Sequence, residues 1–258
     1  MVFGQGDYEV RFDWGPVGAS AIAPGAALVA VVDVLSFTTA LTVAVEQGAA
    51  VLPYPWRDDS AAEAAARHQA VLAVGRSAAG PGQVSLSPAT IVEAASRRRI
   101  DRLVLPSPNG SAISAGLAAT GATVVGVSLR NAGAAAAWVR EQAAGQPVAV
   151  VAAGERWPDG SLRPAVEDLW GAGAFLHFLS GSGEPAAGFS PEAGAAVAAY
   201  RAVAGDLPGA VAETASGREL IAGGFRADVE VAAAAGVSTA VPVLREGWFR
   251  APHRSAAS

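Results

Sequence analysis

The chain has 258 residues, of which 52% are hydrophobic and only 16% are charged, so it can bury a large core and is not intrinsically disordered. Its 18 basic residues are all arginine and it contains no cysteine, which excludes a Walker lysine, a pyridoxal-phosphate Schiff base, disulfides, thiolate zinc sites and cysteine nucleophiles. The formal net charge of −5, without a basic domain surface, argues against nucleic acid as a partner.

Short runs of valine, alanine and leucine recur along the chain, each followed by a loop and an alanine-rich or amphipathic segment. Continuous apolar strands that alternate with helices predict a mostly parallel or mixed central sheet covered on both faces, a three-layer α/β/α fold. We predict a single domain over residues 1–258, with a looser subdivision near residue 160 as the alternative. The predicted strands span residues 8–12, 27–33, 50–54, 70–75, 102–106, 122–127, 147–152 and 238–243.

The predicted helices begin at typical residues: Asp58 to Ser60 cap one start, Ser87 with Pro88 marks a second, and Pro164 lies near a third. Their alanine-rich faces suit a core and a subunit interface equally well, so a homodimer is left open. One uncharged window, residues 112–129, has the length of a membrane span, but its composition and the segment TGAT predict a helix, a turn and a strand. The first residues, MVFGQGDYEV, show no secretory signal, so we expect a cytoplasmic protein without membrane association.

Polar residues gather where the predicted parallel strands end. Ligands of doubly wound sheets bind beyond the carboxyl ends of the strands, near helix N-termini. Five strand exits carry small, hydroxyl-bearing or ionisable groups: Asp33 after VAVV, GRSAAGPGQVSLSP after VLAV, SPNGSA after RLVLP, SLRNA after TVVGV, and GERWPDGSLRP with EDL after VAVVAA.

The segment PSPNGSAIS is the best candidate for an anion cradle. Asn109 and Gly110 tolerate tight-turn backbone, and Ser111 can present its hydroxyl and amide where a helix begins. Arg130 and Asn131 at a second exit add a guanidinium whose planar fork matches phosphate or sulfonate. The alternatives are an ordinary Asn-Gly turn and a helix cap with a solvated arginine.

Carboxylates at the same edge can hold a hard divalent cation. Asp33 ends an apolar strand, and Glu167 and Asp168 stand early in the helix after Pro164. Magnesium is commonly held by one or two carboxylates together with substrate phosphate oxygens. Neighbouring helical residues diverge by about 100°, so we expect one of Glu167 and Asp168 to bind the ion and the other to support it. Alternatively, Glu167 and Asp168 bind no ion and only stabilise the N-terminus of their helix through its dipole.

The order of these motifs resembles the 2-phosphosulfolactate phosphatase (ComB) family of coenzyme M biosynthesis. The resemblance rests on VVDVLSFTT, PSPNGSA, SLRNA, AAGERW...LRPAVEDLWGAGA and ASGRELIAGGFRADVEVAAAAGVSTAVPVL, and it extends roughly over residues 27–244. Each motif alone is weak, but five in the right order are fairly specific. The resemblance implies a three-layer α/β/α fold and a magnesium-dependent phosphatase that converts 2-phosphosulfolactate to 3-sulfolactate.

Residue by residue, the resemblance assigns family positions to Asp33, Asn109, Gly110, Asn131 and the pair Glu167 and Asp168. The chain also departs from the family pattern. Ser36 stands where the family usually has arginine after DVL, Gly75 and Arg76 stand where it often has GE, and residues 86–88 replace its NSP. An arginine lost beside Asp33 and one gained at position 76 can conserve the positive charge that binds an anion while changing its position. The same departures can indicate a different substrate or no catalysis.

The leading hypothesis is a Mg²⁺-dependent phosphomonoesterase for a small anionic organic acid. The expected catalytic residues are Asp33, Asn109, Asn131 and Glu167, the expected metal ligands are Asp33 with Glu167 or Asp168, and the expected substrate-binding residues are Gly110, Ser111, Arg130, Arg76 and Ser36. Attack by water and a phosphoenzyme on Asp33 both remain open. The rivals are a haloacid-dehalogenase-type phosphatase, disfavoured by Leu35 and the missing lysine, and a non-catalytic protein that binds a phosphorylated or sulfonated metabolite.

Overall fold

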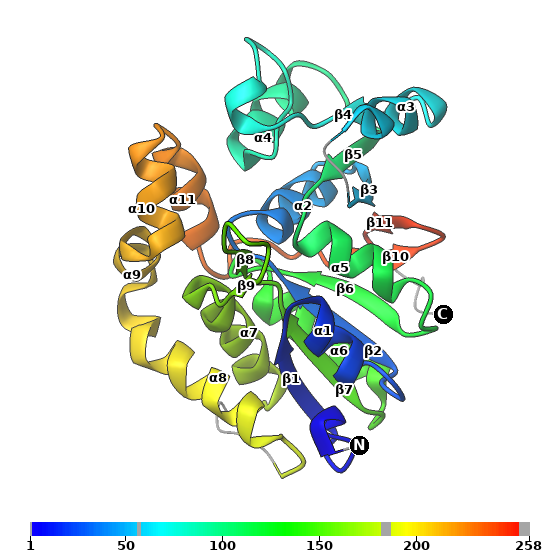
Figure 1. Ribbon diagram of the computed structural model, residues 1–258, viewed down its shortest axis with the longest axis vertical. Helices are drawn as coiled ribbons and strands as arrows, with labels where there is room; N and C mark the ends of the chain where they lie inside the picture. The colour runs from blue at the N-terminus through cyan, green and yellow to red at the C-terminus, as the bar shows by residue number, and fades with distance from the viewer. Residues whose placement is uncertain (1, 56–57, 182–186, 253–258) are drawn as a thin grey trace.

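In the computed structural model, which describes residues 2–55, 58–181 and 187–252, the chain forms a large central sheet flanked by helices (Figure 1). In the described part of the chain, nine strands join this sheet in the order β1-β7-β2-β6-β10-β11-β3-β5-β4, and β8 pairs with β9 in a separate hairpin. The strands are β1 (Val10–Trp14), β2 (Leu28–Val32), β3 (Ala50–Tyr54), β4 (Val71–Leu72), β5 (Arg102–Pro106), β6 (Thr123–Val127), β7 (Val148–Ala152), β8 (Glu155–Arg156), β9 (Leu162–Arg163), β10 (Val243–Arg245) and β11 (Trp248–Arg250).

The apolar strands are explained by burial on both faces of the sheet. Along β2, Leu28, Ala30 and Val32 pack into one hydrophobic cluster. Val29 and Val31 point the other way and pack into a second cluster. Because successive side chains of a strand alternate between the two faces, a strand covered on both sides must be apolar throughout. The predicted three-layer α/β/α fold is therefore confirmed.

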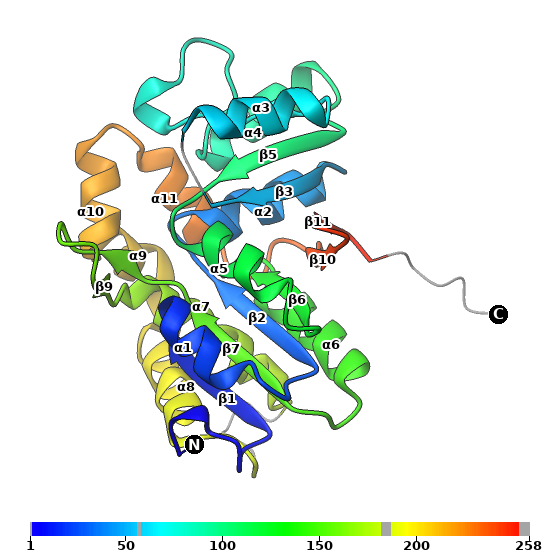
Figure 2. The ribbon, with the colours of Figure 1, turned by 45° about the vertical axis from the view of Figure 1, so that its right-hand side comes forward.

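Helices from both halves of the chain cover the two faces. One cluster includes side chains of α1, α2, α4 and α5, and the other includes side chains of α6, α7, α8, α9 and α11. Figure 2 shows α1 and α5 in front of the sheet, with α6 and α8 behind it. The helices are η1 (Val2–Gly4), α1 (Gly15–Ile22), α2 (Phe37–Glu46), α3 (Asp59–Arg67), η2 (Arg76–Ala78), α4 (Pro88–Arg97), α5 (Gly110–Leu117), α6 (Ala132–Ala143), α7 (Val166–Leu179), α8 (Pro191–Val203), η3 (Ala204–Asp206), α9 (Leu207–Glu213), α10 (Ala215–Ala222) and α11 (Arg226–Ala233).

The predicted bounds of β2, β3, β5, β6 and β7 hold to within one residue at each end, and those of β1, β4 and β10 differ more. The first strand begins two residues later than predicted, β4 covers only two residues of the predicted 70–75, and residues 238–242 are not a regular strand. Pro242 lacks an N–H group, so the ladder with β6 begins only at Val243, which pairs antiparallel with Val125. The antiparallel pair β10–β11 makes the otherwise parallel sheet mixed.

The window of residues 112–129 contains the end of α5, a turn and β6, as predicted. Within the described ranges, no helix has the length and hydropathy that a membrane crossing requires. Strands from both sides of residue 160 pair in one sheet, since the late strands β10 and β11 lie between β6 and β3.

Candidate active site

A cavity of about 350 Å³ lies where β2, β5 and β7 end. Four of the residues singled out from the sequence line it: Asp33, Ser36, Arg76 and Asn109. The structure adds polar residues that the sequence did not single out, from the loop after β5, from the β8–β9 hairpin and from α10: Ser107, Glu155, Arg156, Arg163, Ser216 and Glu219. The hairpin lies beside α10, because Arg163 of β9 donates a hydrogen bond to Ser216 Oγ of α10 at 3.2 Å, and Figure 2 shows the hairpin below α10.

Asp33 is fixed at the end of β2 by backbone amides. Its Oδ1 accepts a hydrogen bond from the N–H of Phe37, at 3.0 Å, and its Oδ2 accepts one from the N–H of Gly110, at 2.8 Å. The side chain is buried. A Cβ atom at position 110 would lie 2.7 Å from Asp33 Oδ2 and 2.5 Å from Phe37 Cδ1, so this approach needs glycine. The two loops after β2 and β5 are therefore locked together around one carboxylate.

Glu155, which the sequence analysis did not select, lies opposite Asn109. The Nδ2 of Asn109 donates a hydrogen bond to Glu155 Oε2 at 2.8 Å. Burial, followed by the negative charge of Asp33, raises the pKa of Glu155 to about 7, although Asn109 and Arg163 act in the opposite direction. The available signal was its position directly after the buried strand 148–152, in the segment GERW. A charged side chain at such an exit is expected to face the ligand edge of the sheet.

Glu155 is expected to make the metal-free protein less stable as the pH rises from about 4.5 to 7. Its pKa is raised on folding, so the folded state binds the proton more tightly, and the resulting stability is present below the unfolded pKa and lost above the folded one. At about 1.4 kcal/mol per pKa unit, the loss amounts to about 3 kcal/mol. The variant Glu155→Gln should therefore gain about this much free energy of unfolding relative to wild type between pH 5 and pH 8.

Urea unfolding with a chelator present, at several pH values, measures this difference. Glu219→Gln is a matched control, because Glu219 lines the same cavity but is exposed, and water already solvates its charge. A difference between Glu155→Gln and wild type that does not change with pH would contradict the assignment.

The neighbouring acids of α7 are placed differently from each other, as the helix geometry predicts. Asp168 Oδ1 accepts the N–H of Val34 at 2.6 Å, and its Oδ2 accepts the N–H of Gly154 at 2.9 Å. Asp168 thereby ties the end of β2 to the end of β7. Burial, and then the charges of Asp33 and Glu167, raise its pKa well above the usual value. Glu167 is 2% exposed, and no hydrogen bond reaches its carboxylate from the described residues.

Three arginines from two parts of the chain bring positive charge to the cavity. Arg156 and Arg163 belong to the β8–β9 hairpin, where Arg156 donates to the carbonyl of Pro108 at 3.2 Å and Arg163 to Ser216 Oγ at 3.2 Å. Arg76 comes from the loop after β4, and its guanidinium contacts the hydroxyl of Ser36. An arginine thus lies beside Ser36, although it comes from a distant part of the chain.

Four residues predicted to bind the anion do not line this cavity: Gly110, Ser111, Arg130 and Asn131. Asn131 is fully buried, and its side chain accepts the N–H of Ser128 and donates to the carbonyls of Gly126 and Ala240. Arg130 donates to the carbonyl of Val231 and pairs with Glu46.

The hydroxyl of Ser111 donates to the carbonyl of Leu105. The side chains of Asn131 and Ser111 thus bond to groups of the protein itself, and neither lines this cavity.

The acidic residues of the cavity offer few ligands to a divalent cation. Among residues 2–55, 58–181 and 187–252, no three histidine, cysteine, aspartate or glutamate side chains lie close enough to enclose an ion. Magnesium needs only one or two carboxylates, because water and phosphate oxygens can complete its octahedron. Asp33 and Glu155 line one cavity, and their mutual repulsion contributes to the raised pKa of Glu155. The donor set therefore fits a cation held by few protein ligands and completed by the substrate.

Comparison with known proteins identifies a family and a relative. The family model described as 2-phosphosulpholactate phosphatase matches residues 19–247. A protein of Thermus thermophilus, described as a probable 2-phosphosulfolactate phosphatase, is 32% identical over 222 residues, which cover 84% of this chain and 88% of that protein. The matched region includes every residue named above as lining the cavity.

Proposed function

The chain belongs to the 2-phosphosulfolactate phosphatase family, and from this premise we propose that it hydrolyses 2-phosphosulfolactate to 3-sulfolactate and phosphate with the help of Mg²⁺. Membership makes it a phosphoric monoester hydrolase. The observation that carries the finer proposal is that one cavity combines the carboxylates Asp33 and Glu155 with the guanidinium groups of Arg76, Arg156 and Arg163. A cytoplasmic location and a role in coenzyme M biosynthesis belong to the same proposal.

The charges of the cavity match those of the substrate. 2-Phosphosulfolactate carries a phosphate, a sulfonate and a carboxylate, and arginine binds such planar or tetrahedral oxyanions through several N–H groups at once. Arg156 and Arg163 come from the β8–β9 hairpin, whereas Arg76 comes from the loop after β4 and contacts Ser36. We therefore assign the phosphate to the side of Asp33 and the hairpin arginines, and the sulfonate to the side of Arg76.

Asp33, Glu155 and Asn109 would organise the reacting end of the substrate. We assign Asp33 and Glu155 to the Mg²⁺ ion, with Glu167 as a further acid close enough to raise the pKa of Glu155. A bound Mg²⁺ would offset the negative charge of the phosphate oxygens. Asn109 orients Glu155 through their hydrogen bond, and the amides of Phe37 and Gly110 orient Asp33. Asp168 supports the site by holding two strand exits together, since both of its oxygens accept backbone amides.

Removal of divalent cations is expected to abolish phosphate release from 2-phosphosulfolactate, and addition of Mg²⁺ to restore it. Binding that depends on Asp33 should also appear without turnover: Mg²⁺ should raise the melting temperature of the wild type and leave that of Asp33→Asn unchanged. The assay measures released phosphate, and thermal unfolding measures binding. Full activity in the presence of a chelator would contradict the metal dependence, whereas no phosphate release under any condition would contradict the proposed substrate.

A further inference from the structure

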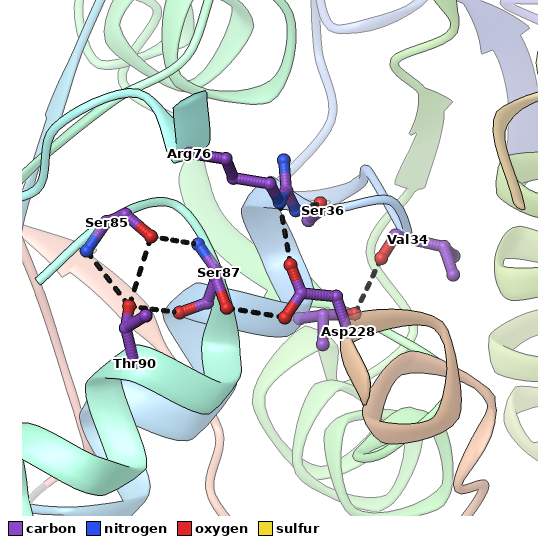
Figure 3. Close-up of polar contacts among 8 residues, drawn as sticks. Val34, Ser36, Arg76, Ser85, Ser87, Thr90 and Asp228 are labelled. Atoms are coloured by element: carbon purple, nitrogen blue, oxygen red, sulfur yellow. Dashed lines mark hydrogen bonds and ion pairs between the residues drawn. The ribbon is translucent and has the colours of Figure 1, made fainter. Parts of the chain in front are cut away.

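Arg76 is held on three sides at the wall of the cavity. Its Nε donates to Asp228 Oδ2 at 2.7 Å, its Nη2 contacts the hydroxyl of Ser36, and its guanidinium carbon lies 5.9 Å from the ring centroid of Phe225. Figure 3 shows the arginine between Ser36 and the carboxylate of Asp228. The third nitrogen, Nη1, has no hydrogen-bond partner among the residues that the structure describes. Because Arg76 lines the cavity, this nitrogen is available to a ligand.

Asp228 is the anchor of this arrangement. It belongs to α11, far along the chain from Arg76, and it is 2% exposed. Its other oxygen, Oδ1, accepts the hydroxyl of Ser87 at 2.5 Å. Asp228 is not part of the cavity lining, so it acts on a ligand through a neighbour, and Arg76 is the hydrogen-bond partner of Asp228 that lines the cavity. A buried carboxylate is costly unless it is paired and hydrogen-bonded, and both of its oxygens are engaged here.

The pair also limits what Arg76 can contribute. Asp228 neutralises the charge of Arg76, so the pair adds little net attraction for an anion at a distance. What remains is a directed N–H group on a guanidinium that cannot rotate freely, since its Nε, its Nη2 and one face are already in contact. A directed charge-assisted donor discriminates between ligands by geometry more than by charge.

We propose that Asp228 is a positioning residue that aims Arg76 at the second acid group of the substrate and so sets the preference for sulfonated phosphomonoesters. The inference rests on the proposed function, because it assumes that the phosphate of the same substrate binds beside Asp33. The hydroxyl of Ser36 contacts the guanidinium of Arg76. Because the side chain at position 36 is short, it leaves room for an arginine from the loop after β4.

The test compares two esters that differ in one group. 2-Phospholactate has a methyl group where 2-phosphosulfolactate has a sulfomethyl group, so the ratio of their kcat/KM values measures recognition of the sulfonate. Asp228→Ala should lower this ratio about tenfold, mainly through a higher KM for the sulfonated ester. Asp228→Asn should restore most of the ratio, because the amide can accept from Arg76 Nε and donate to Ser87. Arg76→Ala should lower the ratio at least as much as Asp228→Ala.

The double variant Arg76→Ala/Asp228→Ala separates positioning from a general structural role. If Asp228 acts through Arg76, the double variant should show the same ratio as Arg76→Ala alone. The double variant also removes both members of the ion pair and so leaves no unpaired charge. The double variant and Arg76→Ala can therefore be compared even where Asp228→Ala alone folds poorly. Ser87→Ala is the matched control, because it removes the other hydrogen bond of Asp228 without touching Arg76; it should leave the ratio unchanged.

Two outcomes distinguish the possible failures. A wild-type protein that releases phosphate from neither ester would overturn the proposed function and this inference with it. A wild type that prefers the sulfonated ester, with Asp228→Ala lowering kcat/KM for both esters equally or adding a further loss to Arg76→Ala, would overturn the inference and leave the proposed function standing.

Discussion

Replacement of Asp33 by asparagine is expected to lower kcat for phosphate release by on the order of 10³-fold. The carboxylate lines the candidate cavity and is held by the amides of Phe37 and Gly110. Asparagine has almost the same shape but no charge, so it would bind a cation weakly. The negative charge of the phosphate would then lack the cation that offsets it. Its NH₂ group would also face one of the two backbone N–H donors, which would then lose its acceptor.

That second effect calls for a matched control, and Asp168 provides one. Asp168 also accepts two backbone amides, from Val34 and Gly154, and it is equally buried, but it does not line the cavity. Asp168→Asn should therefore lose a comparable amount of stability and a much smaller part of kcat. Steady-state phosphate release and urea unfolding of both variants check the prediction. Equal turnover by the wild type and Asp33→Asn would remove Asp33 from the mechanism.

Replacement of Gly110 by alanine is expected to lower both stability and turnover, although no charged group is altered. The added Cβ would lie 2.5 Å from the ring of Phe37 and 2.7 Å from Asp33 Oδ2, and Phe37 is completely buried. Overpacking of this kind costs about 2 kcal/mol. The methyl group would also push the carboxylate away from the amide that orients it, and small displacements of a catalytic group reduce rates by about 10²-fold.

Gly116 is the control for this variant, because it lies in the same helix, is exposed, and a Cβ there would meet nothing within 4 Å. Gly116→Ala should be neutral or stabilise the protein by up to about 1 kcal/mol, through the better helix propensity of alanine. The measurements are thermal unfolding and kcat for phosphate release. A Gly110→Ala variant with wild-type kcat would show that the contact between the two loops does not determine the position of Asp33.

The fold was predictable because its signals are local. Runs such as VAVV and VAVVA are apolar at every position since both faces of the sheet are covered, and the residues that start the helices, such as Asp58 and Ser87, stand at the ends of their own elements. The prediction failed for residues 238–242, where one proline and an antiparallel neighbour decide the pairing. The residue pattern of a strand does not predict which other strand pairs with it, or whether the two are parallel or antiparallel.

In the site, the sequence indicated which strand ends carry chemistry, and Asp33, Ser36, Arg76 and Asn109 do meet in one cavity. It did not indicate how the side chains at those ends are used. Asn131 looked like an anion ligand, but its amide donates to the carbonyl of Ala240, more than a hundred residues away. Arg130 likewise reaches Val231 and Glu46 instead of the cavity.

By itself the sequence determined the layers of the fold, the family, and an acid at the end of a buried strand, because periodicity and motif order are properties of neighbouring residues. Only the tertiary structure decided that Glu155 and Arg163 share a cavity with Asp33, and that Asp228 holds Arg76 against Ser36. The physical reason is that burial, pKa and hydrogen bonding depend on which groups lie nearby in space. Distant segments supply those groups, and no local pattern records which segments they will be.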